Sequence, residues 1–196
     1  MLGDIADPFT QRWRDKQLQY TWLRTLQGQY ADFWQVTADA LDFAMESFGL
    51  SDAALREKLM SLYLSLEMFP DVSETLLALK RLGLKIAILS NGSMPMLLAA
   101  VKNAGLAHLF DAILSADDVR VFKTHPAVYQ LAVDRLSVEP HAIAFVSSNA
   151  WDAYGASAFG MRVFWCNRYG QQPEKLPGNP DFVVRSLHEI PNLMCR

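Results

Sequence analysis

The sequence predicts an α/β protein in which a parallel sheet covered by helices follows an all-helical segment. Before residue 67, apolar residues recur at helical spacings and form no strand-like run. After Asp71, short apolar runs alternate with helical segments, which is the pattern of a parallel sheet with helices on both faces. The pattern changes within the string Met-Phe-Pro-Asp at 68–71. We therefore expect an all-helical domain over 1–66 and a sheet-containing domain over 67–196.

The first segment is expected to be helical over about residues 10–66. One set of apolar residues, spaced three or four apart, predicts a shared helix face: Trp22, Leu26, Tyr30 and Phe33. A second set, Leu41, Ala44 and Phe48, stops at Gly49, a residue suited to a helix end. A third set follows Ser51, a suitable N-cap, and comprises Leu55, Leu59, Leu62, Tyr63 and Leu66.

The second segment contains five short apolar runs with strand character, at 85–89, 112–115, 142–147, 161–166 and 182–184. Helices are predicted over 72–82, 93–105, 126–136 and 152–159, several of them bounded by Asp, Ser, Pro or Gly. The stretch 169–180 is rich in Gly, Pro and Gln and is expected to be an exposed loop.

The composition limits the class of protein. The chain has 196 residues, of which 51% are apolar and 20% charged, with a formal net charge of −3. This composition argues against a disordered chain and against the basic surface of a nucleic-acid-binding protein. Two cysteines, Cys166 and Cys195, are too few for a disulfide scaffold. No apolar run has the ~18 residues of a membrane span and no signal peptide is recognisable, so we expect a cytosolic protein.

Two polar turns follow predicted strands. Ser90, Asn91 and Ser93 surround Gly92 at the start of a predicted helix, and Ser147 to Asp152 occupy a second turn from strand to helix. Ligands of open α/β sheets bind beyond the carboxyl ends of strands, and backbone N–H groups at a helix start attract anions. The alternative for each turn is that these residues serve only as turn formers, caps or dipole partners.

Taken singly, the other polar residues give weaker evidence of a functional role. Lys123 follows an apolar pair and precedes a predicted helix, although a single lysine is usually a solvated charge. Arg14 lies among aromatic residues whose ordinary role is in a core. Cys166 ends an apolar strand, so we expect a buried thiol rather than a nucleophile. The four histidines, His108, His125, His141 and His188, show no metal-ligand spacing.

Four strings resemble those of the L-2-haloacid dehalogenases, the hydrolytic type II enzymes of the haloacid dehalogenase superfamily. They are WRDKQLQYTWLR, LKIAILSNGS, VFKTHPAVYQLA and FVSSNAWDAYGASAFG, and the resemblance runs from about Arg12 to Pro191. It implies a Rossmann-like core with an inserted helical cap. It also implies covalent catalysis, in which an aspartate carboxylate displaces halide from the substrate and water hydrolyses the resulting ester.

The resemblance assigns roles to particular residues. Arg14 accepts the leaving halide, which Asn91 and Trp151 help to hold, and Ser90 helps to hold the substrate carboxylate. Lys123 keeps the nucleophile ionised, while Asp152 pairs with that lysine or positions the hydrolytic water. The remaining residues fall on supporting positions or on the wall of an apolar pocket: Ser147, Asn149, Tyr129 and Phe33. The implied partners are a small 2-haloalkanoic acid and halide, and a homodimer is possible.

Related phosphatases of the superfamily hold Mg²⁺ through several oxygen ligands at the turn that follows the strand predicted here over 142–147. Here that turn has Ser147, Ser148 and Asn149, with Asp152 as its acid, so we expect no metal and no cofactor. One small departure from the dehalogenase pattern is Thr124, which stands where the family usually has proline.

A larger departure concerns the nucleophile. The family carries it at the end of its first strand, in a string like F-D-x-Y-G-T, and this sequence contains no such string. Asp4 and Asp7 follow no apolar run, so neither is assigned as nucleophile. We expect that a first segment of roughly 25 residues, with room for a ~5–6-residue strand, is missing. Its absence would leave unpaired edges on the strands that end at Ser90 and Ser147.

Three functions therefore remain open. The first is 2-haloacid dehalogenation by a protein whose first segment is missing here. The second is a non-catalytic relative that binds small carboxylates or halide. The third is a phosphatase of the same superfamily.

Overall fold

The computed structural model describes residues 2–194, which form two compact units. The first unit contains the residues up to Glu67 together with Ser90–Asn103 and Ser115–Phe122. The second contains Met68–Leu89, Ala104–Leu114 and the residues from Lys123 onward. The change near residue 67 falls where the sequence pattern changes, but two later segments group with the helical residues. The division into domains 1–66 and 67–196 stays a prediction.

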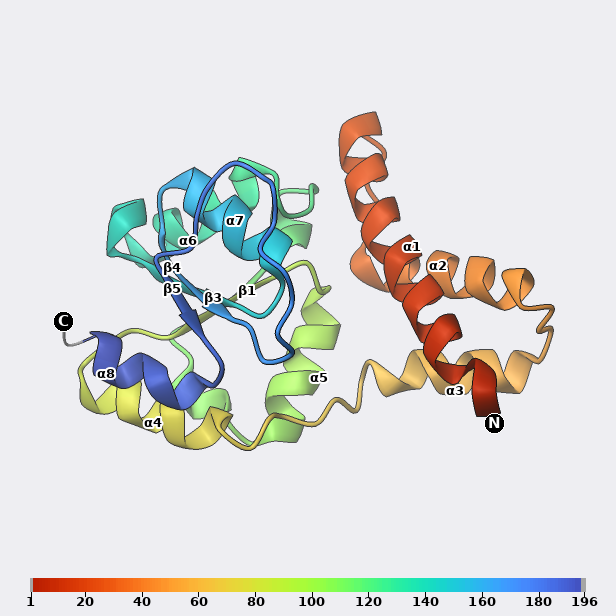
Figure 1. The fold of residues 1–196 in the computed structure, drawn as a ribbon, viewed down its shortest axis with the longest axis horizontal. Helices are drawn as coiled ribbons and strands as arrows, with labels where there is room; N and C mark the ends of the chain where they lie inside the picture. The colour runs from red at the N-terminus through yellow and green to blue at the C-terminus, as the bar shows by residue number, and fades with distance from the viewer. Residues whose placement is uncertain (1, 195–196) are drawn as a thin grey trace. The chain divides into compact units, whose positions relative to one another are not determined.

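The first unit is built mainly from three helices (Figure 1): α1 (Ala6–Gln27), α2 (Phe33–Ser47) and α3 (Ala53–Leu62), preceded by the 3₁₀ turn η1 (Gly3–Ile5). Phe9 and Trp13 of α1 pack against Leu41 and Ala44 of α2, and all four side chains are buried. The buried Trp13 indole N–H is satisfied because it donates to the Thr37 carbonyl at 2.9 Å. An apolar stripe on each helix thus forms the core of this unit.

The predicted shared face across Trp22, Leu26, Tyr30 and Phe33 is wrong. Gly28 adopts a left-handed conformation (φ 65°) and ends α1, so Tyr30 and Phe33 lie beyond that helix. Leu26 is 83% exposed, which excludes it from the core.

The third helix also differs from the prediction. Its N-cap is Asp52 rather than Ser51, because the Asp52 carboxylate accepts the backbone N–H groups of Ala54 and Leu55. The helix ends at Leu62, which is exposed along with Leu66, and the buried side chain of α3 is Met60. The second predicted helix is confirmed, since α2 ends at Ser47, two residues before Gly49, with Leu41 and Ala44 buried.

The strands all lie where short apolar runs predict them: β1 (Ala87–Ser90), β2 (Ala112–Ser115), β3 (Ala144–Ser147), β4 (Arg162–Cys166) and β5 (Phe182–Val184). The intervening helices are α4 (Val72–Arg81), α5 (Met94–Ala104), α6 (Pro126–Leu136), α7 (Ala150–Phe159) and α8 (Ile190–Met194). Four 3₁₀ turns complete the chain: η2 (Ala107–Leu109), η3 (Ala116–Asp118), η4 (Pro140–Ala142) and η5 (Leu187–Glu189). The predicted helix and strand order is confirmed, although α8 was not predicted.

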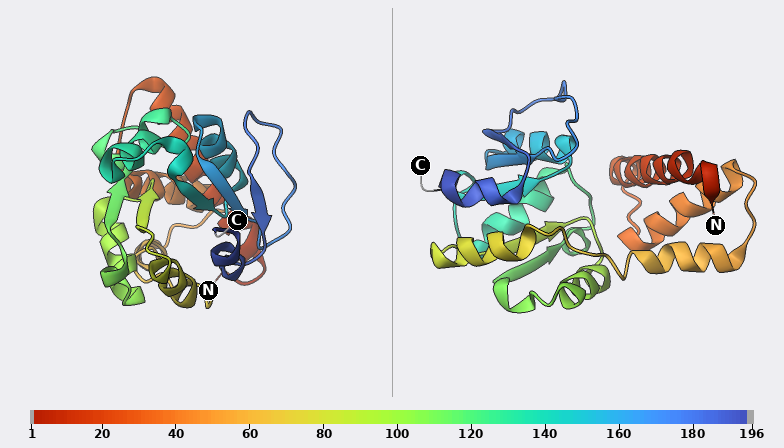
Figure 2. Two further views of the ribbon diagram at one scale, coloured as in Figure 1. Left: turned by 90° about the vertical axis from the view of Figure 1, so that its left-hand side faces the viewer. Right: turned by 60° about the horizontal axis from the view of Figure 1, so that its bottom comes forward.

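Strands β3, β4 and β5 form a parallel sheet with Ser147 opposite Trp165 and Trp165 opposite Val183. One face, which includes Phe145 and Val163, packs on α6 and α7 in a continuous buried cluster. The other face, which includes Phe164 and Cys166, packs toward α4 and α8, and these two helices lie side by side (Figures 1 and 2). The expected α/β fold, with a parallel sheet covered on both faces, is confirmed.

The sheet is divided in two. Among the residues described, β1 is hydrogen-bonded to β2 and β3 to β4, and β1 and β3 are not joined; Figure 2 (left) draws the two groups of strands apart. Ala87 and Leu89 of β1 nevertheless pack against the same buried cluster as Phe145 of β3. Both halves therefore share one core, and the unpaired edges expected on these two strands are present.

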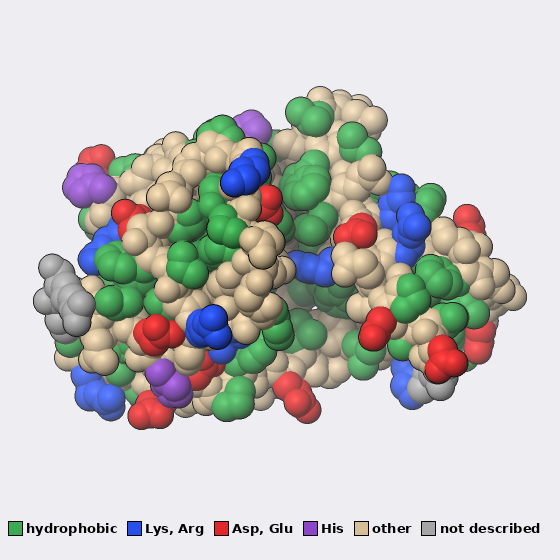
Figure 3. All heavy atoms as spheres, viewed as in Figure 1, with side chains coloured by type: hydrophobic (Ala, Val, Ile, Leu, Met, Phe, Trp, Pro, Cys, Tyr) green, Lys and Arg blue, Asp and Glu red, His purple; other side chains and the backbone are tan. Residues whose placement is uncertain are grey.

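No helix formed by residues 2–194 has both the length and the apolar character needed to span a bilayer. On the face shown in Figure 3, basic and acidic side chains are interspersed rather than segregated.

Candidate functional site

A buried ion pair lies at the carboxyl end of β3. The Nζ atom of Lys123 is 2.9 Å from Oδ2 of Asp152, and the two side chains are only 7% and 5% exposed. Lys123 is therefore not the solvated charge that a single lysine usually is. Its ammonium also lies 4.8 Å from the centre of the Phe145 ring, a favourable cation–π position.

The Asp152 carboxylate accepts hydrogen bonds from two further side chains. The Ser147 hydroxyl donates to Oδ2 at 2.9 Å, and the buried Tyr129 hydroxyl donates to Oδ1 at 3.0 Å. Burial, and then the negative charge of Asp152, raises the pKa of Tyr129 well above its usual range, so the phenol stays a hydrogen-bond donor. Three donors from three elements of structure thus surround one carboxylate.

The turn from β3 to α7 explains how this group is assembled. Ser147 is the last residue of β3 and its hydroxyl accepts the Asn149 backbone N–H at 3.2 Å. Asn149 is the N-cap residue of α7, and Asp152 lies in the first turn of that helix. A carboxylate near a helix start is favoured by the helix dipole. Trp151, half-buried, lies one residue before Asp152 in the same turn.

Close contact between α7 and the Lys123 loop depends on a glycine. A Cβ atom at Gly155 would lie 2.6 Å from both the Tyr129 hydroxyl and the Thr124 Cγ2 atom. Only glycine lets the helix approach this closely. Gly155 lies in the string FVSSNAWDAYGASAFG, which carries part of the resemblance, but the sequence did not predict the packing role of this glycine.

The first unit contains the other polar turn. Ser90 ends β1, and its hydroxyl accepts the Gly92 backbone N–H at 3.0 Å. Asn91 is buried, with 8% of the residue exposed. The Ser115 hydroxyl donates to the Gly92 carbonyl at 2.7 Å and ties the turn to the end of β2. The turn formation expected of Ser90 is therefore present, and Asn91 is held where little solvent reaches it.

Phe33 belongs to an aromatic cluster in the same unit. The ring of the buried Phe122 lies 5.3 Å from that of Tyr30 and 6.1 Å from that of Phe33. The Phe122 backbone N–H donates to the Thr25 hydroxyl at 3.1 Å, which joins this segment to α1. Phe33 thus belongs to an aromatic cluster, and its place on the wall of a substrate pocket stays a prediction. The sequence did not assign Phe122 to this cluster, because its position beside Phe33 depends on tertiary contacts.

Arg14 is exposed on α1. Burial raises the pKa of Tyr63, against smaller lowering effects of the Gln17 hydrogen bond and of the Arg14 charge. The ten predicted site residues therefore fall into two groups. The second unit brings together Lys123, Tyr129, Ser147, Asn149, Trp151 and Asp152, and the first unit holds Arg14, Phe33, Ser90 and Asn91. Their catalytic and binding roles stay predictions.

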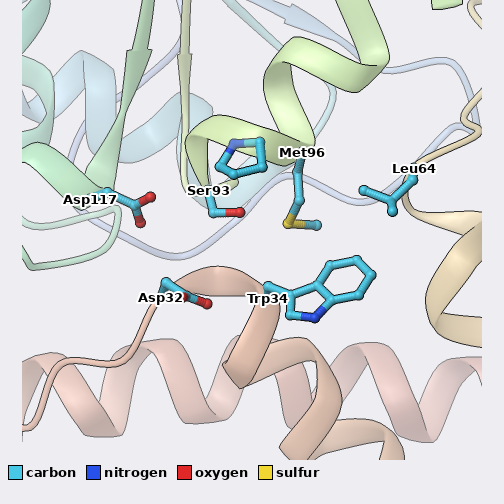
Figure 4. A pocket seen from close by; sticks show the side chains of 7 residues that line it. Asp32, Trp34, Leu64, Ser93, Met96 and Asp117 are labelled. Atoms are coloured by element: carbon cyan, nitrogen blue, oxygen red, sulfur yellow. The ribbon is translucent and has the colours of Figure 1, made fainter. Parts of the chain in front are cut away.

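A cavity of about 320 Å³ lies within the first unit (Figure 4). Its wall is formed by Asp32, Trp34, Leu64, Ser93, Pro95, Met96 and Asp117. The Asp117 carboxylate accepts the Tyr30 hydroxyl and, at 3.3 Å, the Met94 backbone N–H at the start of α5. None of the cavity residues was assigned a role from the sequence except Ser93, which was expected to cap α5.

Cys166 is 1% exposed, as expected of a buried thiol, and burial raises the pKa of this thiol. Cys195 lies outside the described residues. Within residues 2–194, no cluster of three or more His, Cys, Asp or Glu side chains has the arrangement of a metal site.

Comparison with known proteins gives a consistent family. Residues 7–160 match the family model for haloacid dehalogenase-like hydrolases. The curated protein named (S)-2-haloacid dehalogenase 1, from Pseudomonas sp. strain CBS-3, is 44% identical over 196 residues, which cover all of this chain and 86% of that protein.

Solved structures agree with the sequence relatives. A crystal structure described as a dehalogenase superposes with a TM-score of 0.95 at 46% identity, covering 99% of this chain and 86% of that one. The L-2-haloacid dehalogenase of Xanthobacter autotrophicus, solved with chloropropionic acid covalently bound, superposes with a TM-score of 0.92 at 39% identity. That superposition covers 98% of this chain and 88% of the neighbour.

Proposed function

Because this chain belongs to the haloacid dehalogenase-like hydrolases, we propose that its activity is the hydrolytic dehalogenation of short-chain L-2-haloacids to 2-hydroxy acids. The observation that carries this proposal is the buried group of Lys123, Asp152, Ser147 and Tyr129 in a chain this similar to named 2-haloacid dehalogenases. The neighbour with chloropropionic acid covalently bound supports a covalent route.

The reaction has two displacement steps. A carboxylate oxygen attacks the halogen-bearing carbon, and the carbon–halogen bond breaks with its electron pair leaving on the halide. Water then adds to the carbonyl carbon of the ester, which releases the 2-hydroxy acid, a proton and the regenerated carboxylate.

Asp152 is not this nucleophile. Its carboxylate already accepts hydrogen bonds from Lys123, Ser147 and Tyr129, and it is 3% exposed, so attack would require breaking a satisfied buried network. We assign it instead to holding Lys123 in place. The nucleophile is then the aspartate that the family carries after its first strand, in the F-D-x-Y-G-T string that this sequence does not contain.

The second unit supplies the residues that act on that carboxylate and on water. Lys123 presents a buried positive charge, which keeps a neighbouring carboxylate ionised. Ser147 and Tyr129 hold Asp152, and Asn149 shapes the same turn through its backbone N–H. We assign Trp151, one residue before Asp152, to the halide.

The first unit supplies anion-binding groups. We assign Arg14 and Asn91 to the leaving halide and Ser90 to the substrate carboxylate, since guanidinium, amide and hydroxyl groups donate hydrogen bonds to anions. Phe33, with its aromatic neighbours Tyr30 and Phe122, forms an apolar wall suited to an alkyl group.

The test is release of halide from L-2-chloropropionate, measured by ion chromatography. Two proteins are compared: the chain as printed, and the chain preceded by a segment that carries an apolar strand followed by F-D-x-Y-G-T. We expect halide from the second, because the added strand can pair with the free edges of β1 and β3 and bring the nucleophile. A matched control has asparagine for that aspartate and should release none. If the extended protein also releases no halide, the dehalogenase assignment is wrong.

A second candidate is a non-catalytic relative that binds halide or small carboxylates. The observation that favours it is the saturated Asp152 carboxylate, which leaves this group of residues without a nucleophile. It predicts that the printed chain binds chloride or L-lactate but turns over no haloacid. A stop codon directly upstream of the first codon would favour it, and an in-frame F-D-x-Y-G-T string would favour the enzyme. A phosphatase would instead require Mg²⁺-dependent hydrolysis of a phosphate ester.

We also propose a homodimer and a cytosolic location. Support for the dimer comes from the exposed apolar residues near the end of α1, Trp22, Leu23 and Leu26, which are 39%, 43% and 83% exposed. Sedimentation of the chain and of Leu26→Lys tests this, since a charge within the contact should shift the protein toward monomer.

A further inference from the structure

A hydroxyl group lies on the wall of the cavity in the first unit. Ser93 is only 5% exposed, and its hydroxyl makes no hydrogen bond with any residue in the described part of the chain. Figure 4 shows this hydroxyl directed into the cavity, toward the side of Met96 and Trp34. A hydroxyl can accept and donate hydrogen bonds, so its place on the cavity wall offers a polar contact to a ligand.

The cavity wall is also negatively charged. Asp32 and Asp117 both line it, and none of its lining residues is a lysine, arginine or histidine. Asp32 uses its carboxylate to accept the Gln35 N–H at 2.8 Å as the N-cap of α2, and a carboxylate has room for further donors. Asp117 likewise accepts Tyr30 and the Met94 N–H. Two anionic groups and one hydroxyl acceptor favour a ligand that carries several N–H donors.

The opposite part of the wall is apolar. Trp34, Leu64 and Met96 line it, and the close-up shows their side chains turned toward the same space as the two aspartates (Figure 4). An indole face attracts cations as well as hydrocarbon. The volume of about 320 Å³ is at the lower end of the range for small-molecule sites.

We propose that this cavity binds a small primary alkylammonium ion. Its three N–H groups would donate to Asp32, Asp117 and Ser93, and its short hydrocarbon chain would contact Trp34, Met96 and Leu64. A bare metal ion fits less well, because half of the wall offers no oxygen ligand. The proposal does not depend on the dehalogenase activity, because none of these six residues takes part in the proposed reaction.

The test is isothermal titration of the full chain with n-butylammonium chloride. We expect saturable binding with a dissociation constant in the range of about 1 mM, weakening as salt is raised. Two probes of similar shape serve as controls: 1-butanol lacks the charge and butyrate reverses it. Both should bind at least about tenfold more weakly. Equal binding of 1-butanol, or no saturable heat from n-butylammonium, would overturn the proposal.

Two variants locate the site. Asp32→Asn keeps a good N-cap for α2 but removes the charge, and it should weaken n-butylammonium binding by about tenfold. Asp52→Asn is the matched control, because Asp52 caps α3 in the same way and is not among the cavity residues. The NMR resonance of the Trp34 indole N–H, assigned with the Trp34→Phe variant, should shift when n-butylammonium is added to the parent protein or to Asp52→Asn. Equal affinity of the two asparagine variants would place the binding elsewhere and reject the proposed cavity.

Discussion

The Lys123 ammonium and the Asp152 carboxylate lie 2.9 Å apart with less than a tenth of either side chain exposed. Such a pair is costly to bury and costly to break, since removing one member leaves the other charged and without its partner. Its position at the end of β3, with Ser147 and Tyr129 bonded to the same carboxylate, links the stability of the second unit to its proposed chemistry.

Replacement of Lys123 tests how much its ion pair with Asp152 contributes to the free energy of unfolding. Lys123→Met should lower the free energy of unfolding by about 3–5 kcal/mol, because Asp152 loses its buried counter-charge. Urea unfolding at pH 7 measures the change. The matched control is Arg56→Met, which removes an ion pair with Asp42 whose side chains are 40% and 46% exposed, and it should cost less than about 1 kcal/mol. Equal costs for the two variants would contradict the interpretation.

A double replacement distinguishes lost packing from an unpaired charge. Lys123→Met combined with Asp152→Leu removes both charges and should be more stable than Lys123→Met alone. If the double variant is the less stable one, the cost of the single variant does not arise from the isolated carboxylate.

The Tyr129 hydroxyl gives a second prediction. Tyr129→Phe removes one donor to the Asp152 carboxylate without changing the ring, and it should cost about 1.5–3 kcal/mol as a hydrogen bond to a charged group. Tyr169→Phe is the control, because Tyr169 is 75% exposed. A change at position 129 as small as that at position 169 would show that this hydrogen bond contributes little.

The close approach at Gly155 gives a third prediction. Gly155→Ala places a methyl group 2.6 Å from the Tyr129 hydroxyl, and overpacking of this kind costs about 1–3 kcal/mol. The same substitution in a Tyr129→Phe background should cost less, because one of the three crowding atoms is gone. Thermal unfolding of the four proteins forms a double-mutant cycle. Strictly additive costs would exclude the contact as the cause.

The fourth prediction concerns pH. Asp71 is buried, and the Arg168 guanidinium at 2.8 Å holds the pKa of its carboxyl far below the usual range, with help from Leu187 N–H and Ser186 and against the effect of burial. A carboxyl whose pKa is depressed in the folded state stabilises that state at pH values above its pKa in the unfolded chain, which is about 4. This stabilisation is lost as the pH falls toward the folded-state pKa. Asp71→Asn should therefore be less stable at pH 7 and should lose less stability between pH 5 and pH 2.

Urea unfolding at several pH values measures this slope, and Asp4→Asn is the control because Asp4 is exposed. If Asp71→Asn keeps the slope of the parent protein, the Asp71 carboxyl does not account for its acid sensitivity.

Local patterns in the sequence determined most of the secondary structure. The predicted runs 112–115 and 182–184 coincide with β2 and β5, and the helix predicted over 126–136 coincides with α6. These elements follow from period, proline and polar boundaries, which act within a few residues. The prediction failed at Gly28, where the apolar spacing continued although the left-handed glycine ended α1. Periodicity does not report such a break when apolar residues stand on both sides of it.

The sequence also identified the polar turn that holds Ser147 and Asp152, because polar residues directly after an apolar strand are unusual. Only the tertiary structure decided that Lys123 is buried, since its partner lies 29 residues away along the chain and burial of a lysine requires that partner. The same is true of the cavity around Ser93, whose wall comes from segments between Asp32 and Asp117. Local spacing specifies helices and strands, whereas burial, ion pairing and cavities depend on which distant segments pack together.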